Sequence, residues 1–379
     1  MAPIERLTDD LLLEEILSRL PAKSVCRFKC AYKNWLRLVD HPGHRKSLPH
    51  SLAGFFYNSA SEAISAPHFV NASASGRSFI NPSFAFLPDH RRLHLLDCCN
   101  GLILCRLYDV STTGDDEFRY VVCNPATEEW VALPDRSKAG KVDWARLGFD
   151  PAASPHFHVF VLLLDARQFI SRVDVYSSET RAWIHKDKQW DEDVRVADTW
   201  SPTVYLNGYL HLLTVCAEWH PFISVVDTKG ETWSNFETPG DWYGNELYGG
   251  GLSIAFIQRS QGQLHYATFH HDEEDAENEA RMQVYALENY ANKDLDWIVK
   301  HTVELSQADV FGGIFEGEFC WIAIHPESNL IYFIEGSDDT LKCYSMDQEE
   351  ATEVCTLGEG QPPYMPYVPL YSKLESLSM

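Results

Sequence analysis

The sequence predicts a small all-α N-terminal unit of three short helices, followed by an all-β propeller of six or seven blades. Three observations lead to this fold class. Helical spacing of leucines is confined to residues 7–40 of the 379-residue chain. From about residue 50, short β-rich runs alternate with turn residues. Within this second part, a segment that ends in tryptophan recurs about every 50 residues.

The N-terminal unit opens with an amphipathic helix whose apolar positions follow i, i+3, i+4 and i+7 spacing and so share one face. They are Leu13, Ile16, Leu17 and Leu20. Pro21 ends this helix, a second helix carries Val25 and Phe28, and a third short turn carries Trp35. A unit of this size buries little apolar surface by itself. We therefore expect it to dock on the rest of the chain or on a partner.

The remainder of the chain has the pattern of β-hairpins. Apolar and β-branched runs, such as residues 158–164, are bounded by turn residues. Three of these turns, Asn100-Gly101, Asn207-Gly208 and Gln261-Gly262, have the residue types of two-residue hairpin loops. The pattern predicts antiparallel strands joined by tight turns.

A repeat organises these hairpins into blades. Copies lie at residues 122–130, 175–183 and 226–233, with a looser copy at 284–297 and a degenerate one at 343–346 and 353–354. Their four tryptophans are 53, 50 and 64 residues apart. We expect each tryptophan to open a strand and to pack between neighbouring sheets. A single blade cannot bury both of its faces, so blades should close into a ring. The alternative is a pair of open β-sandwiches.

Charge is distributed unevenly between the two parts. Residues 1–50 hold nine basic and six acidic side chains, whereas the rest of the chain holds 22 basic and 49 acidic ones. The acidic body would repel a phosphate backbone, so we expect no nucleic-acid partner. No apolar run is long enough for a membrane span, and the N-terminus lacks the pattern of a signal peptide. We expect ten reduced cysteines in the cytoplasm or the nucleus.

The sequence offers no catalytic motif, because it lacks a Gly-x-Ser-x-Gly elbow, a phosphate-binding loop and a His-Glu-x-x-His pair. We therefore expect no catalytic residue, no metal and no cofactor. The Cys98-Cys99 pair is interpreted as strand packing, and the acidic run at residues 270–279 as a solvated hairpin tip. Aromatic residues in expected loops are candidates for binding a target protein. They are Trp200, Trp219, Trp242 and Tyr243.

The N-terminal string, from Leu7-Thr8-Asp9-Asp10-Leu11 through residues 15–30 to Lys33-Asn34-Trp35, resembles an F-box of the plant type. The resemblance implies docking on a Skp1-like adaptor and, through it, on a cullin–RING ubiquitin ligase. The expected Skp1-binding residues are Leu12, Ile16, Leu17, Leu20, Pro21, Val25, Phe28 and Trp35. Two departures are visible, one extra residue within Leu11–Glu15 and Tyr32 at a position where the family has a small residue.

The body resembles the F-box-associated domain of plant F-box proteins, through Asn100-Gly101-Leu102-Ile103 and the segment 124–130. Its period is kelch-like in length, although the glycine runs at 249–251 and 312–313 do not keep register with the tryptophans. We expect an F-box at 1–46, a linker with the first β-strands at 47–90 and a substrate-binding propeller at 91–379. The resemblance implies a non-catalytic adaptor that recruits a target protein for ubiquitination. The alternatives are a propeller binding module that acts outside a ligase and a propeller enzyme.

Overall fold

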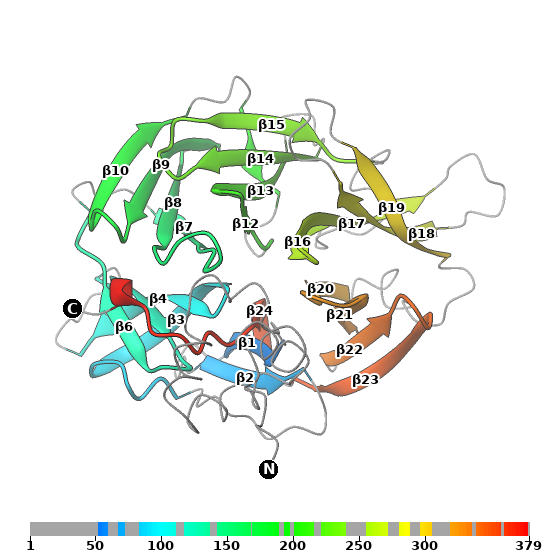
Figure 1. Cartoon of the computed structure of the whole chain (residues 1–379), viewed down its shortest axis with the longest axis horizontal. Coiled ribbons are helices and arrows are strands. Elements are labelled where there is room, and N and C mark those ends of the chain that lie inside the picture. Colours follow the sequence, from blue (N-terminus) through cyan, green and yellow to red (C-terminus); the bar gives the residue numbers. More distant parts are fainter. Residues whose placement is uncertain are drawn as a thin grey trace, which may run out of the picture.

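The computed structural model describes residues 52–59, 67–72, 83–110, 117–136, 142–167, 169–188, 193–197, 201–215, 221–239, 255–271, 280–288, 296–304, 319–335, 339–357 and 360–377. Within these residues the secondary structure is β-strand, apart from one short 3-10 helix, η5 (Glu375–Leu377). The strands form six sheets around a central axis (Figure 1). The predicted all-β propeller is confirmed with six blades, and the open β-sandwich alternative is wrong.

Five blades are built from consecutive antiparallel strands that run from the axis to the periphery (Figure 1). Blade 1 contains β3 (His90–Cys99), β4 (Leu102–Asp109), β5 (Arg119–Asn124) and β6 (Glu129–Ala132). Blade 2 contains β7 (Val142–Gly148), β8 (His158–Leu164), β9 (Ile170–Ser177) and β10 (Ala182–Asp187). In blade 3, β11 (Arg195–Val196) and β12 (Val204–Leu206) both pair with β13 (Tyr209–Val215), which is followed by β14 (Pro221–Asp227) and β15 (Trp233–Glu237).

The next two blades repeat this order. Blade 4 contains β16 (Ala255–Ser260), β17 (Gln263–His271), β18 (Ala280–Leu287) and β19 (Trp297–Glu304). Blade 5 contains β20 (Phe319–Ile324), β21 (Leu330–Glu335), β22 (Thr340–Ser345) and β23 (Glu350–Thr356). The degenerate fifth repeat therefore forms β22 and β23, where Ala351 packs on the core in place of a tryptophan.

The first and the last strands of the ring join in the sixth, closing blade. Its inner strand is β24 (Gly360–Tyr367), which pairs with β1 (Gly54–Ser59), and β1 pairs with β2 (Pro67–Asn71). The register sets Gly54 opposite Tyr367 and Phe56 opposite Met365. The inner strands β3, β7, β12, β16, β20 and β24 each contact the next one around the axis. This pairing closes the ring with hydrogen bonds and removes the exposed sheet edge.

The hydrophobic core is divided into six clusters, each lying in the seam between two neighbouring blades. Leu104 and Val122 of blade 1, for example, pack with Val159 and Val161 of blade 2. The other five clusters join blades 2 and 3, 3 and 4, 4 and 5, 5 and the closing blade, and the closing blade and blade 1. All six seams are filled by described residues, so each blade buries both faces only because the ring is closed.

The tryptophan repeat has the predicted role. Trp130, Trp183, Trp233 and Trp297 are the first or second residues of the outermost strands β6, β10, β15 and β19. Each packs against the core cluster of a different seam. The kelch-like glycine runs at 249–251 and 312–313 lie outside the described residues, so their comparison with kelch repeats stays a prediction.

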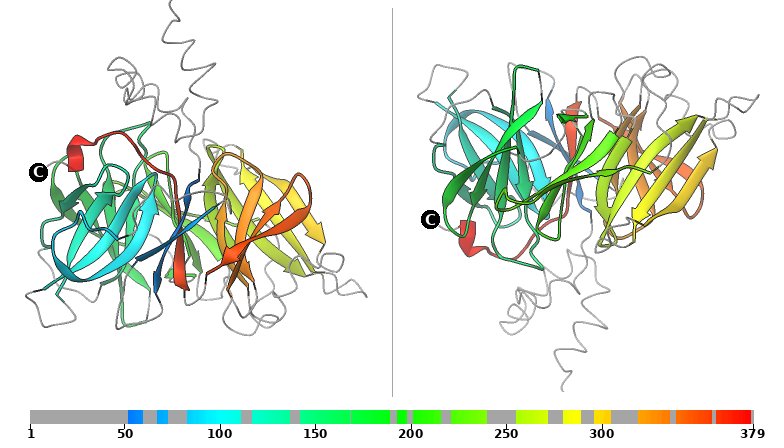
Figure 2. Two further views of the ribbon diagram at one scale, coloured as in Figure 1. Left: turned by 90° about the horizontal axis from the view of Figure 1, so that it is seen from below. Right: turned by 90° about the horizontal axis from the view of Figure 1, so that it is seen from above.

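The turns between first and second strands gather at one face of the ring, which we call the hairpin face. Asn100-Gly101, Asn207-Gly208 and Gln261-Gly262 all have positive φ at both residues, which is the geometry of type I′ hairpin turns. β24 ends and β1 begins at the same face, because Gly54 pairs with Tyr367. The C-terminal coil after β24 also runs along this face toward η5 (Figure 2).

Candidate functional site

The residues predicted from sequence to bind partners lie outside the described residues. This holds for all eight expected Skp1-binding residues, Leu12 to Trp35, and for Trp200, Trp219, Trp242 and Tyr243. In sequence, position 219 falls between β13 and β14, and positions 242–243 fall between β15 and β16. Strands β13 and β15 end, and strands β14 and β16 begin, at the face opposite the hairpin face. The roles of these residues stay predictions.

A cavity that sequence reasoning missed opens at the centre of the hairpin face. Its volume is about 660 Å³, and its walls come from the first strand-to-strand connections of five blades and from the end of β24. The wall includes Asn100, Asp150, His158, Tyr205 and Arg259. The signal that could have located it is the set of hairpin turns, since a closed ring brings every such turn to one face around the axis.

Polar contacts between blades fix the wall of this cavity. Asn100 donates a hydrogen bond from Nδ2 to the carbonyl oxygen of Phe149 at 2.6 Å, and the Cys99 thiol donates to the same oxygen at 3.3 Å. These two bonds tie the β3–β4 turn to the β7–β8 connection. Arg259 of blade 4 forms an ion pair with Asp150 of blade 2 at 3.3 Å, so this contact joins two blades that are not neighbours in the ring.

The two adjacent thiols of the cavity wall are poor nucleophiles. Burial raises the pKa of the Cys99 thiol to about 12 and that of Cys98 well above its ordinary value, and Asp97 raises both further. A thiol reacts as its thiolate, so these cysteines stay protonated at neutral pH. Cys99 packs against the core cluster between blades 1 and 2, and Cys98 packs against the cluster between the closing blade and blade 1, as predicted for strand-packing residues. The described residues hold seven cysteines, and all of them are free.

A buried carboxyl group lies next to a smaller cavity of about 80 Å³ near the axis. Asp97 accepts hydrogen bonds from the backbone nitrogens of Leu147 at 2.7 Å and Cys98 at 2.9 Å. Burial raises the pKa of Asp97 to about 6, although the nearby charge of Arg146 lowers it. The Arg146 guanidinium lies 4.1 Å above the ring of Trp144. The bond to Leu147 joins β3 to β7, so Asp97 links two inner strands.

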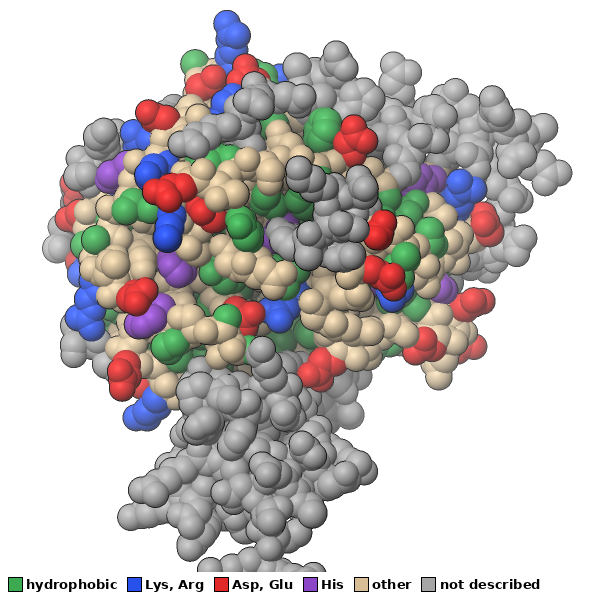
Figure 3. Space-filling model, turned by 45° about the horizontal axis from the view of Figure 1, so that its top comes forward, with side chains coloured by type: hydrophobic (Ala, Val, Ile, Leu, Met, Phe, Trp, Pro, Cys, Tyr) green, Lys and Arg blue, Asp and Glu red, His purple; other side chains and the backbone are tan. Residues whose placement is uncertain are grey.

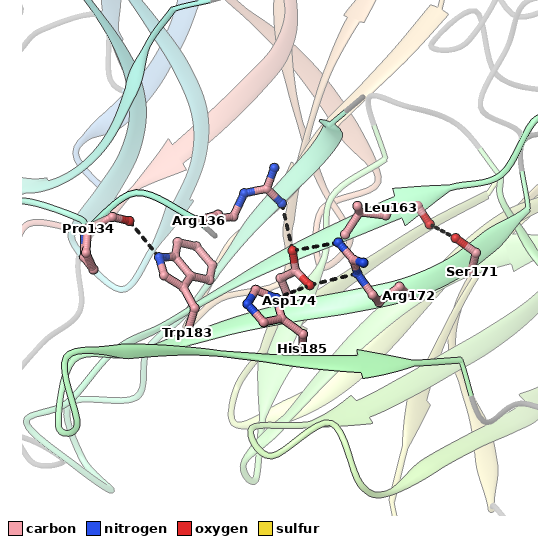
Figure 4. Close-up of polar contacts among 8 residues, drawn as sticks. All are labelled: Pro134, Arg136, Leu163, Ser171, Arg172, Asp174, Trp183 and His185. Atoms are coloured by element: carbon pink, nitrogen blue, oxygen red, sulfur yellow. Dashed lines mark hydrogen bonds and ion pairs between the residues drawn. The ribbon is translucent and has the colours of Figure 1, made fainter. Parts of the chain in front are cut away.

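A second polar group lies in the seam between blades 1 and 2, and Figure 4 shows its contacts. Asp174 of β9 is fully buried and lies 3.0 Å from Arg136, 3.0 Å from Arg172 and 2.7 Å from Nδ1 of His185. The indole nitrogen of Trp183 donates to the carbonyl oxygen of Pro134 at 2.8 Å. Arg136 and Pro134 follow β6, so both contacts cross from blade 1 to blade 2.

The visible surface carries both signs of charge. Acidic and basic side chains are interspersed over the face in Figure 3, and its coloured residues form no broad basic area. Within the described part of the chain, no three His, Cys, Asp or Glu side chains gather in a way that could hold a metal ion. The same part contains no helix that is long and apolar enough to span a membrane.

The fold and its centre define a closed six-bladed β-propeller with a polar axial cavity. Residues 77–369 match the family model described as the F-box associated beta propeller domain, and residues 4–47 match the F-box domain. The first match covers more than half of the chain. The chain therefore belongs to the F-box-associated β-propeller family, and it carries an F-box domain at its N-terminus.

Relatives among curated proteins come from Arabidopsis thaliana. The chain is 26% identical over 309 residues to F-box protein At5g07610, which covers 78% of this chain and 70% of that protein. It is 24% identical over 347 residues to F-box protein At5g49610, which covers 85% and 87%. These relatives and the two domain matches support, in general terms, a substrate-adaptor role in SCF ubiquitin ligases.

Among solved structures, the chain is similar to propellers at low scores. The β-propeller domain of Cps50 (Swd1) from Myceliophteria thermophila is 10% identical, covers 84% of this chain and 90% of its own, and has a TM-score of 0.42. TolB from Acinetobacter baumannii is also 10% identical, covers 86% and 69%, and has a TM-score of 0.43.

Proposed function

We propose that this protein is the substrate-recognition subunit of an SCF (Skp1–cullin–F-box) E3 ubiquitin ligase. The apolar faces of residues 1–46 dock on a Skp1-like adaptor, and the ring holds a target protein so that it is ubiquitinated. The protein is a non-catalytic adaptor in this scheme, because it contributes position and effective concentration and no nucleophile or general base. It acts in the cytoplasm or the nucleus.

One observation carries the proposal, namely an F-box domain match at residues 4–47 in front of a ring that closes by itself. The pairing of β24 with β1 and the six filled seams use residues 52–377 only. The seams of the ring are therefore filled without a contribution from the predicted N-terminal helices. This separation favours a partner that binds residues 1–46 directly, and it weakens the alternative in which the predicted helices cover the ring.

An enzymatic role finds little support in the geometry. Asp97 has a raised pKa, and a glycosidase-like or lyase-like site would need a second catalytic ionisable group close to it. Both oxygens of Asp97 already accept backbone hydrogen bonds, and Asp150 pairs with Arg259. These carboxylates hold strands together, which is the expected behaviour of a scaffold.

The direct test is a pull-down of purified Skp1-like adaptor with the double variant Ile16→Asp and Leu20→Asp. Two charges on the predicted docking face should abolish capture, because an unpaired carboxylate cannot be buried at an apolar interface. A matched control places the same changes on the ring, at Val110→Asp and Val299→Asp, where the side chains are 62% and 52% exposed. The control should keep wild-type capture, and undiminished capture by the first variant would overturn the proposal.

A further inference from the structure

Residues 368–377, which follow β24, cross the hairpin face from the closing blade to blade 2, and we call them the strap (Figure 2). Leu370, Leu374 and Leu377 of the strap are buried within the core cluster that joins blades 1 and 2. The end of a chain is ordinarily poorly ordered unless it is tied down. The three leucines therefore make the strap an anchored part of the ring.

Hydrogen bonds and close packing hold the strap along its length. Nδ2 of Asn124, a fully buried side chain, donates to the carbonyl oxygen of Leu370 at 2.7 Å. Oγ of Ser376 donates to the carbonyl oxygen of Pro155, in the β7–β8 connection, at 3.0 Å. The strap also passes so close to the β3–β4 turn that a Cβ added at Gly101 would lie 2.5 Å from Cβ of Leu370. The strap therefore ties the end of β24 to blades 1 and 2.

The strap begins at the place where the N-terminal part of the chain enters the ring. The backbone nitrogen of Ala53 donates to the carbonyl oxygen of Tyr367 at 2.9 Å, and Gly54 is paired with Tyr367 in the sheet. Tyr367 is fully buried, and its ring packs edge-on against that of Phe56 at 5.2 Å. The end of β24 therefore holds the first residues of β1, and the strap, which starts at Val368, holds β24 in turn.

The length of the chain limits where residues 1–46 connect to the ring. Residues 47–51 separate them from Leu52, and because an extended chain spans at most about 3.6 Å per residue, this link reaches about 20 Å. The ring is about 25 Å deep along strands such as β4, which has 8 residues with a rise of about 3.3 Å each. Residues 1–46 therefore join the ring on the side of the hairpin face.

We propose that the strap fixes the direction in which residues 1–51 leave the ring, and that it thereby sets the position of a bound Skp1-like adaptor on the side of the hairpin face. The first half concerns the free protein, whereas the second half rests on the proposed function. Trp219, Trp242 and Tyr243, predicted to bind a target, fall in connections of the opposite face. The adaptor and the target are then held on different sides of the ring.

The first test is hydrogen exchange, measured by mass spectrometry on the full chain without an adaptor. The double variant Leu374→Asp and Leu377→Asp should release the strap, because a carboxylate cannot be buried without a partner. We expect exchange in residues 52–56 to become at least about tenfold faster, and exchange in residues 263–271 of blade 4 to keep the wild-type rate. Unchanged exchange in residues 52–56 would overturn the proposal.

Further variants separate release of the strap from loss of the fold. Lys373→Asp with Glu375→Asp places the same two side chains at exposed positions of the strap and should exchange like wild type. If the buried aspartates prevent folding, the milder pair Leu374→Ala and Leu377→Ala takes their place and should also raise exchange in residues 52–56. An equal rise in all six blades would contradict a local role of the strap.

The second test measures where the adaptor lies in the complex. One spin label is introduced as a genetically encoded residue at the exposed hairpin-face position Asn207 and a second one on the adaptor, and electron–electron resonance gives their distance distribution. We expect a narrow distribution for wild type, and a broad one with unchanged adaptor affinity for the strap variant. Equally narrow distributions would overturn the role in adaptor placement. Absence of adaptor binding by wild type would overturn the proposed function and this second half, while hydrogen exchange still decides the first half.

Discussion

Two seams of the ring solve the same packing problem with different chemistry. The seam between blades 4 and 5 is aromatic, and Trp321 lies within about 6 Å of Phe256, Phe269 and Phe319. The seam between blades 1 and 2 adds a buried polar group to its apolar cluster, where Asp174 meets two arginines and a histidine. Every seam of this ring contains an apolar cluster, whereas the buried polar group around Asp174 is an addition to one seam. We call this group the polar clamp, and we infer that it fixes the orientation of blade 1 relative to blade 2.

The indole nitrogens make the same distinction. Nε1 of Trp183 donates to Pro134 across the polar seam, whereas Nε1 of Trp321 is buried in the aromatic seam without a partner among the described residues. Trp321 therefore contributes through its area and shape, and Trp183 contributes through area and one directed bond.

The largest effect is expected in the aromatic seam. Trp321→Ala removes a side chain that is 94% buried and leaves a cavity between two blades, which should lower the free energy of unfolding by about 4 kcal/mol. Urea denaturation followed by fluorescence and circular dichroism measures the change. A loss below about 1 kcal/mol would show that the seam collapses around the gap or that it bears little of the stability.

Asp174→Asn should break the polar seam with a somewhat smaller loss. The neutral amide leaves Arg136 and Arg172 facing each other without a counter-charge, and breaking such a buried pair costs about 3 kcal/mol. Asp193→Asn is the matched control, because Asp193 pairs with Lys188 at the exposed surface. The control should leave unfolding unchanged. Equal behaviour of the two variants would mean that the clamp is not a structural element.

A single buried histidine tests whether a polar group elsewhere in the ring also matters. His211 is fully buried in blade 3, its Nδ1 lies 2.9 Å from the carbonyl oxygen of Val204, and burial lowers its pKa to about 4 from about 6.5. Between these values the unfolded chain binds a proton that the folded protein does not, so stability falls as the pH falls. We expect a loss of about 2 kcal/mol from this group between pH 7 and pH 5.

The variant His211→Gln should remove that part of the pH dependence, and His68→Gln, at an exposed position of β2, should not. The measurement is urea denaturation at both pH values. If the pH dependence of His211→Gln equals that of wild type, His211 does not resist protonation in the folded protein.

The smallest effect separates the two tryptophans. Trp183→Phe loses the bond to Pro134 and leaves its carbonyl oxygen without that donor, which should cost about 1 kcal/mol. Trp321→Phe loses no hydrogen bond and should cost less than Trp321→Ala by a wide margin. Thermal unfolding of the two variants measures both effects, and an unchanged melting temperature of Trp183→Phe would contradict the role assigned to its hydrogen bond.

Sequence reasoning predicted the elements whose cause is local. The hairpin turns follow from residues that accept positive φ, such as Asn100 and Gly101, and the strand periods follow from alternating burial. The blade number remained open between six and seven because the closing blade has no tryptophan repeat and combines the first two strands of the ring with its last strand. Only the pairing of Gly54 with Tyr367 decides the number.

The polar groups could not be predicted, because they unite residues that are distant in sequence. Arg136 and Asp174 are 38 positions apart, and Asp150 and Arg259 are 109 apart. Their side chains meet only after the ring closes, and no short motif marks them. The axial cavity has the same origin, since Thr203 and His158 come from different blades.

We propose that residues 1–46 and the ring are separate modules and that only residues 1–46 bind the ligase. The most direct measurement compares the full chain with residues 47–379, by gel filtration, circular dichroism and titration of a Skp1-like adaptor. We predict that residues 47–379 remain soluble and folded and bind no adaptor, whereas the full chain forms a complex with it. Aggregation of residues 47–379 would show that the helices cover the ring, and adaptor binding by residues 47–379 would show that the docking surface lies elsewhere.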